Sequence, residues 1–114
     1  MDQDNKPSYS IRAARDFSRV AFAGTLRLQT RQEYEKILVA LRYVTRHSGD
    51  KIEIDFRDLQ FLNSVGIAIF SLFVIETREI KKKVTITGSK AIAWQSRALH
   101  NLSRLNENLT VNLS

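Results

Sequence analysis

The sequence is poor in the residues that build several common kinds of site. It contains no cysteine, which excludes disulfide frameworks, thiolate metal sites and cysteine nucleophiles. Its two histidines, His47 and His100, lie far apart in the chain, so we expect no histidine-rich metal centre. The longest apolar run, residues 64–75, is too short to cross a lipid bilayer.

The amino-terminal residues also lack the pattern of a signal peptide. The segment MDQDNKPSYS is polar and has no basic stretch followed by an apolar one. The chain has 114 residues, of which 43% are hydrophobic and 26% charged, which is typical of one packed domain. We therefore expect a single cytoplasmic domain over residues 1–114, with residues 1–7 as a flexible tail.

The charge is basic, with a net value of +6, and suggests an acidic partner or surface. The excess is spread out: residues 1–63 carry 11 basic and 9 acidic side chains, and residues 64–114 carry 7 and 3. The one dense basic run, Lys81-Lys82-Lys83, follows a predicted helix, where cations stabilise the helix dipole. Nucleic-acid binding therefore has only modest support.

Hydrophobic periodicity predicts alternating strands and helices. Thr30 and Glu33 form a capping box that begins the first helix, which ends near residues 47–49. Asn63 is a natural N-cap for a second helix over residues 64–80. A third helix is predicted over residues 91–105, with Trp94 in or near the core. Period-two alternation predicts strands over residues 9–13, 20–28, 51–56, 83–88 and 109–113.

The resulting order is β-β-α-β-α-β-α-β, which is typical of an α/β fold. Strands joined through a helix pair in parallel, whereas the opening hairpin is antiparallel, so the sheet is mixed. Residues 51–56 alternate strictly between apolar and charged side chains, whereas a strand buried on both faces would be apolar throughout. We therefore expect the helices to pack mainly on one face of the sheet.

Functional sites in such folds lie beyond the carboxyl ends of the parallel strands. The segment at that place, residues 55–67, contains two carboxylates, one guanidinium and a hydroxyl at a helix start. Its sequence Asp55-Phe-Arg-Asp-Leu-Gln-Phe-Leu-Asn-Ser64-Val-Gly66 resembles the STAS domain family, which includes the bacterial anti-sigma factor antagonists. The family pattern is a hydrophobic strand, an aspartate, a loop with an apolar pair, and Asp-Ser-Ser-Gly or a variant that opens a helix.

The resemblance implies a STAS-like fold and a regulatory protein-interaction module of the partner-switching type. It implies neither an enzyme, a cofactor nor a small-molecule substrate. The implied partner is an anti-sigma factor or serine kinase of the histidine-kinase-like ATPase type, which would phosphorylate Ser64. A serine phosphatase would remove the phosphate.

The same resemblance assigns roles to the residues around Ser64. Asp55 and Arg57 would support the site from close behind, and Gly66 would permit close approach of the partner. The residues expected to bind the partner are Asp58, Phe61, Leu62, Asn63, Val65 and Gly66.

Two positions depart from the family pattern. Asn63 replaces the family's aspartate, which removes a negative charge beside Ser64 but keeps a helix cap. Val65 replaces a small residue and makes the site more apolar. Some relatives of this fold act without phosphorylation.

Three other interpretations remain open. The chain could be a constitutive accessory subunit of a membrane transporter ATPase, touching the membrane only through that partner. It could bind nucleic acid or another anionic surface through Lys81, Lys82 and Lys83. Catalysis by the pair Asp55 and Asp58 ranks last, because a strand-end residue and a turn residue account for both.

Overall fold

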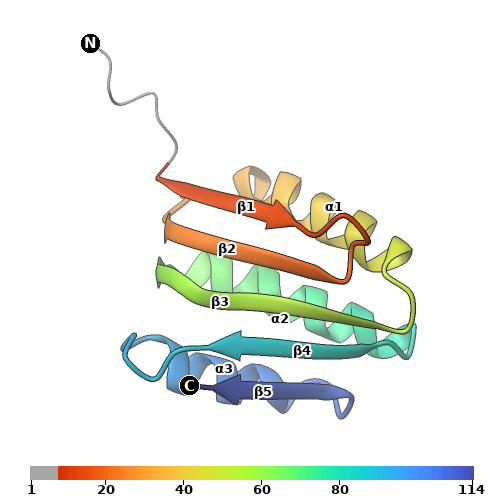
Figure 1. The fold of residues 1–114 in the computed structure, drawn as a ribbon. Coiled ribbons are helices and arrows are strands. Elements are labelled where there is room, and N and C mark those ends of the chain that lie inside the picture. The colour runs from red at the N-terminus through yellow and green to blue at the C-terminus, as the bar shows by residue number, and fades with distance from the viewer. Residues whose placement is uncertain (1–7) are drawn as a thin grey trace.

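The computed structural model describes residues 8–114, which form five strands and three helices (Figure 1). The strands lie in the sheet in chain order; β1 is antiparallel to β2, and the other neighbours are parallel. The predicted element order and mixed sheet are confirmed. The tail expected over residues 1–7 lies outside the described residues. The elements are β1 (Tyr9–Ala13), β2 (Arg19–Leu26), α1 (Arg31–His47), β3 (Lys51–Leu62), α2 (Ser64–Glu79), β4 (Lys83–Gly88), α3 (Gln95–Ser103) and β5 (Leu109–Leu113).

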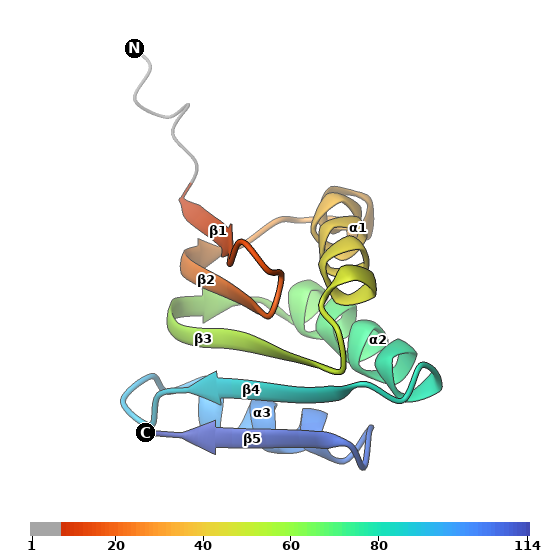
Figure 2. The ribbon, with the colours of Figure 1, turned by 45° about the vertical axis from the view of Figure 1, so that its right-hand side comes forward.

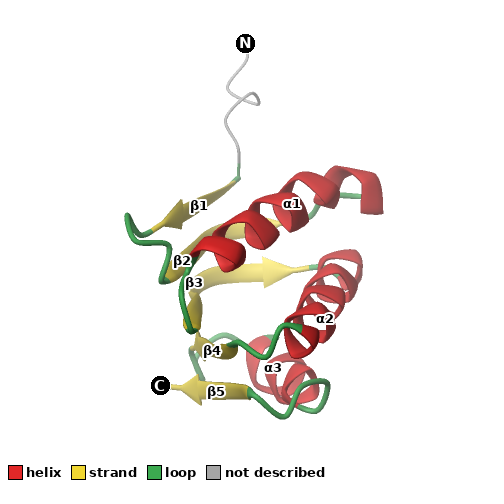
Figure 3. Ribbon diagram, turned by 90° about the vertical axis from the view of Figure 1, so that its right-hand side faces the viewer, coloured by secondary structure: helices red, strands yellow, loops and turns green. Residues whose placement is uncertain are grey.

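All three helices pack on one face of the sheet, as expected (Figures 2 and 3). The core between the layers is centred on three aromatic rings, those of Phe22, Phe56 and Phe70, whose centroids lie 4.9–5.4 Å apart. The predicted capping box at the start of α1 is present: Thr30 Oγ1 accepts from the N–H of Glu33, and the Glu33 carboxylate accepts from the N–H of Thr30. None of the helices formed by residues 8–114 has the length and apolar character needed to cross a membrane.

Strand β3 is twelve residues long, twice the predicted length. Its pairing with β2 contains two irregularities: Ala21 lies opposite Asp55 and Ala23 opposite Asp58, and a second shift follows Gly24. Each is a β-bulge that adds one residue to β3. The inward side chains are therefore Phe56, Leu59 and Leu62, at a spacing of three. Period-two alternation ends at Phe56. The sequence therefore predicts a loop where the structure has the second half of β3.

Helix α3 starts at Gln95, later than predicted, because residues 89–94 form turns. The turns are held by Gln95, a buried side chain that accepts from the N–H of Ser89 at 2.7 Å. Its amide nitrogen donates to the carbonyls of Phe56 (2.6 Å) and Leu59 (3.0 Å). These carbonyls belong to β3 beyond Asp55, where its pairing with β4 ends. Gln95 thus supplies donors where the sheet no longer does.

Candidate functional site

The start of α2 is fixed by the side chain of Asn63. Its Oδ1 accepts hydrogen bonds from the N–H of Gly66 (3.0 Å) and from the hydroxyl of Tyr34 (2.6 Å). Its Nδ2 donates to the carbonyl of Leu28 at 2.8 Å. Tyr34 lies on α1 and Leu28 lies in the β2–α1 connection, so one amide ties α2 to two other parts of the chain.

This arrangement gives a physical reason for asparagine at position 63. An aspartate could still cap the helix and accept from Tyr34, but it would place an oxygen where Nδ2 now faces the Leu28 carbonyl. Two acceptors would then face each other without a proton between them. Burial raises the pKa of Tyr34, so its hydroxyl stays protonated and keeps donating at neutral pH. The departure from the family's aspartate therefore belongs to a set of matched contacts.

Ser64 is exposed and is the first residue of α2. The N–H groups of Gly66 and Ile67 are bonded to Asn63, which leaves the helix end with the N–H groups of Ser64 and Val65. These groups and the helix dipole favour a negative charge at this position. The site can therefore hold an anionic group on Ser64 without a change of fold.

The residues expected to bind a partner differ in exposure. Asp58 and Phe61 are exposed, and Asn63 and Val65 are half-buried. Leu62 is buried, with 4% of its surface exposed, and pairs in register with Leu26 in the core. The structure therefore corrects the assignment of Leu62 to the contact surface.

Gly66 is also buried, so its assignment to the contact surface is corrected as well. A Cβ at this position would collide with the side chain of Leu62 and would lie 2.7 Å from the hydroxyl oxygen of Tyr34. Gly66 thus allows α2 to pack closely on α1 and β3, and its lack of a side chain serves the interior of the protein.

Phe61 is the large apolar side chain that this surface exposes, with 38% of its area accessible. The guanidinium of Arg27 lies over its ring, 4.8 Å from the centroid, in a cation–π contact. No pattern in the sequence indicates a place for Arg27 in this surface. The parallel pairing of Leu26 with Leu62 brings it here, and that register follows from two bulges that the sequence pattern does not show.

Asp55 and Arg57 lie in the middle of β3 and not at the start of α2. Leu62 lies seven residues beyond Asp55 in β3, which corresponds to at most about 23 Å at roughly 3.3 Å per residue. The expectation that both residues support Ser64 from close behind is therefore corrected. They lie on the sheet face that the helices leave open, since the neighbouring positions Ile54 and Phe56 point into the core.

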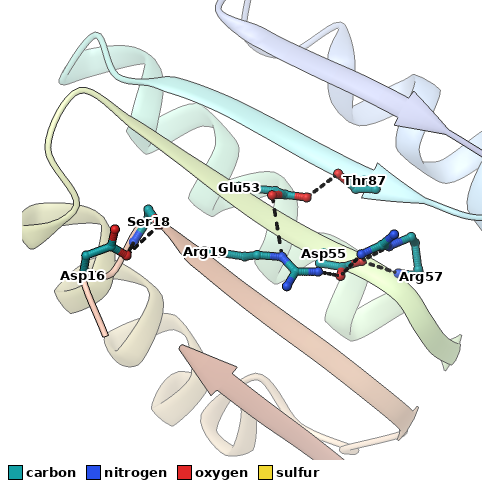
Figure 4. A network of polar contacts seen from close by, with 7 residues as sticks. All are labelled: Asp16, Ser18, Arg19, Glu53, Asp55, Arg57 and Thr87. Carbon is teal, nitrogen blue, oxygen red and sulfur yellow. Dashed lines mark hydrogen bonds and ion pairs between the residues drawn. The ribbon is translucent and has the colours of Figure 1, made fainter. Parts of the chain in front are cut away.

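Asp55 instead holds the first bulge of β3 (Figure 4). Its Oδ1 accepts from the backbone N–H of Arg57 (2.9 Å) and from Arg57 Nε (3.0 Å), and its Oδ2 accepts from Arg57 Nη2 (2.9 Å). Arg19 pairs with the same carboxylate from β2. Burial by itself would raise the pKa of Asp55, but the hydrogen bonds and charge of Arg57 and the charge of Arg19 outweigh it, so the pKa lies below its usual value.

The same network continues across the sheet to β4. Arg19 Nε lies 3.6 Å from Glu53, and Glu53 accepts a hydrogen bond from Thr87 Oγ1 at 2.7 Å. The four charged side chains of this network, Arg19, Glu53, Asp55 and Arg57, each have a partner of opposite charge. The network therefore ties three strands together, and it offers no unpaired carboxylate for acid–base chemistry.

The fold is shared with a protein of known structure. It matches the activator SiaC in the crystal structure of the diguanylate cyclase SiaD with its activator SiaC from Pseudomonas aeruginosa. The TM-score is 0.70, over 93% of this chain and 92% of that chain, at 11% sequence identity. No family model and no curated protein sequence matches the chain. The STAS-like fold is thus confirmed, while at this identity the roles of individual residues do not transfer.

Proposed function

We propose that this protein is a regulatory protein-interaction module, and not an enzyme, that binds a partner protein at the start of α2 and releases it when Ser64 is phosphorylated. The observation that carries the proposal is the exposed Ser64 at the first position of a helix whose cap is fixed by Tyr34 and Leu28. The shared fold supports a regulatory role, because SiaC is described as an activator of an enzyme.

The proposed switch changes the surface and leaves the fold intact. A phosphate adds a charge of about −1.5 to −2. At an exposed helix start this charge is favourable by about 0.3–1 kcal/mol, so α2 tolerates it. In the interface, the dianion has to lose its water beside the apolar side chains of Phe61 and Val65, which is costly. The complex therefore loses affinity while the free protein keeps its structure.

The partner that best fits this switch is the one that the resemblance to anti-sigma factor antagonists implies. It is a serine kinase of the histidine-kinase-like ATPase type that both binds the module and phosphorylates Ser64, with a serine phosphatase to reverse the reaction. The surface offered to it consists of Phe61, Ser64 and Val65, with Asn63 behind them. Asp58 is corrected together with Asp55 and Arg57, because it lies beside them in the middle of β3 and not at the start of α2. Such a cycle takes place in the bacterial cytoplasm.

Intact-mass spectrometry of the protein from its native host, wild type beside Ser64→Ala, tests the proposal. We expect a species heavier by one phosphate in wild type alone, and loss of the copurifying kinase from Ser64→Glu. Two results together would contradict the switch: wild-type protein that never carries phosphate, and a transporter's nucleotide-binding subunit that copurifies equally with wild type and with Ser64→Ala. They would indicate a constitutive subunit of that transporter instead.

A further inference from the structure

The net positive charge of the protein corresponds to one continuous segment that lacks acidic residues, although basic residues occur along the whole chain. Residues 80–106 contain six lysines or arginines and neither aspartate nor glutamate, which equals the net charge of +6 for the whole chain. The remainder of the chain is neutral. A comparison of the two halves of the sequence hides this feature, because the acidic residues Glu76 and Glu79 fall in the same half. The segment forms β4, α3 and their connections.

An open groove of about 1090 Å³ runs between α2 and this basic segment. The two helices lie side by side on the covered face of the sheet (Figure 3). Apolar side chains that are only half-buried line the groove from both sides, namely Ile67 from α2 and Trp94 and Leu105 from the two ends of α3. Its exposed rim is formed by Arg97 and His100.

The rim carries positive charge at Arg97 and, beyond the end of α3, at Arg104. Arg97, His100 and Arg104 follow the spacing i, i+3 and i+7, so they lie along one face of α3 and its C-cap. The run Lys81-Lys82-Lys83 does not line the groove, and Lys82 instead donates to the carbonyl of Thr45 and to Ser48 Oγ at the end of α1. The accessible charge beside the groove is therefore that of α3.

The groove is continuous with the proposed switch. Ser64, Ile67 and Ser71 are spaced by three and four residues, so they lie on one face of α2. Ile67 and Ser71 line the groove, and Ser64 lies one turn beyond it. A phosphate on Ser64 would add negative charge at one end of a basic groove.

Trp94 gives the groove a rigid apolar anchor. Its indole Nε1 donates to the carbonyl of Leu59 at 3.0 Å, and its ring meets that of Phe56 with centroids 5.9 Å apart. Because the ring is already held in place, an incoming group does not have to immobilise it. Fixed aromatic side chains of this kind are typical of the residues that carry binding energy in protein interfaces.

We infer that this groove binds an acidic amphipathic helix of the partner protein. Apolar side chains of that helix would contact Ile67, Trp94 and Leu105, and its carboxylates would face Arg97 and Arg104. The inference rests on the proposed function and names the chemistry of the partner segment that would lie in the groove next to Ser64. It also explains release, because a phosphate on Ser64 repels an acidic helix. The apolar lining favours a peptide over a nucleic acid, which needs phosphate contacts along its whole length.

Trp94 is the only tryptophan of the chain, so its fluorescence reports directly on the groove. The probe is a synthetic helix of about five turns with leucines at i, i+3, i+4 and i+7, glutamates beside them, glutamine elsewhere and no aromatic residue. One control peptide has lysine in place of glutamate, and another has alanine in place of leucine. We expect saturable, salt-sensitive binding of the acidic leucine peptide alone.

A matched pair of charge reversals separates the groove from the net charge. Arg97→Glu should weaken binding of the acidic peptide by about tenfold and favour the lysine peptide. Arg31→Glu changes the net charge equally at an exposed position at the start of α1, and binding should stay as in wild type. Equal effects of both reversals would overturn the inference. A single-stranded oligonucleotide that changes Trp94 emission at lower concentration than the acidic peptide would also overturn it.

The test uses unphosphorylated protein, so it does not depend on a kinase. Suppose that the acidic peptide binds selectively, that Arg97→Glu reverses this selectivity, and that the protein from the native host carries no phosphate. The groove would then be supported and the phosphorylation switch contradicted. Phosphorylated Ser64 with no binding of the acidic peptide would do the opposite. Ser64→Glu should lower the affinity for the acidic peptide more than Ser64→Ala does, because the introduced carboxylate repels the acidic peptide.

Discussion

Asp55, in the middle of β3, and Asn63, directly after the end of β3, both hold the local backbone, but with different chemistry. Each side chain accepts a backbone N–H group close behind it in sequence, that of Arg57 or of Gly66, and each ties together distant parts of the chain. Asp55 uses charge, with arginine partners that are 41% and 48% exposed. Asn63 uses a neutral amide whose partners are a tyrosine hydroxyl and a carbonyl.

The two sets of contacts differ in how much they contribute to the free energy of unfolding. Ion pairs with exposed arginines are screened by water and salt. If the ion pair is lost, each guanidinium can be hydrated by solvent instead. The partners of Asn63 are the hydroxyl of the buried Tyr34 and the carbonyl of the half-buried Leu28, so losing the amide leaves at least one buried polar group without a partner, at a cost of about 1–3 kcal/mol. We therefore expect the neutral contacts to stabilise the fold more than the charged ones, although the charged ones are more numerous.

The largest effect is expected for Asn63→Ala. It removes the cap of α2 and leaves the hydroxyl of Tyr34 and the carbonyl of Leu28 without their partner. Loss of a cap and of buried hydrogen bonds should together lower the free energy of unfolding by about 2–4 kcal/mol. Urea denaturation followed by circular dichroism measures it. Ser64→Ala is the neighbouring control and should stay within about 0.5 kcal/mol of wild type, as an exposed substitution does.

A smaller effect is expected for Asn63→Asp, which introduces the aspartate of the STAS pattern that the sequence resembles. The cap and the contact from Tyr34 remain, but the Leu28 carbonyl loses its donor and meets a second acceptor. We expect a loss of about 1–2 kcal/mol in the same denaturation experiment. Stability equal to wild type would show that the Leu28 contact does not select asparagine, and would weaken the view that Asn63 is matched to its surroundings.

The sequence predicted the element order, the covered face and both helix caps, because these depend on periodicity and on local hydrogen bonds. It did not predict how far β3 extends. The two bulges change the spacing of inward residues from two to three, and their partners, Ala23 and Gly24 on β2, are known only from the register. Because the predicted strand ends at Phe56, six residues too early, the sequence places Asp55 and Arg57 too close to α2. For the same reason it places Leu62 in a surface loop and not in the core.

The smallest effect is expected for Asp55→Asn. The amide oxygen still accepts the N–H of Arg57, so the bulge is kept, and the amide nitrogen takes the place of Oδ2. The two arginine side chains that donated to Oδ2 are exposed and can turn to solvent, so the attraction is lost without a buried mismatch. The loss at neutral pH should be about 1 kcal/mol.

The pKa of Asp55 is lower in the folded protein than in the unfolded chain, so its contribution is present above the unfolded pKa and is lost as the pH falls through the folded pKa. The stability difference between wild type and Asp55→Asn should therefore shrink as the pH is lowered below about 4, and it should shrink with added salt at neutral pH. Asn63→Ala is the comparison in both titrations: its partners carry no charge in this range, so its deficit should persist. If instead the Asp55→Asn deficit exceeds that of Asn63→Ala at pH 7 and resists salt, the ion pairs stabilise the sheet more than the neutral cap stabilises α2, and the ranking of the two sites is reversed.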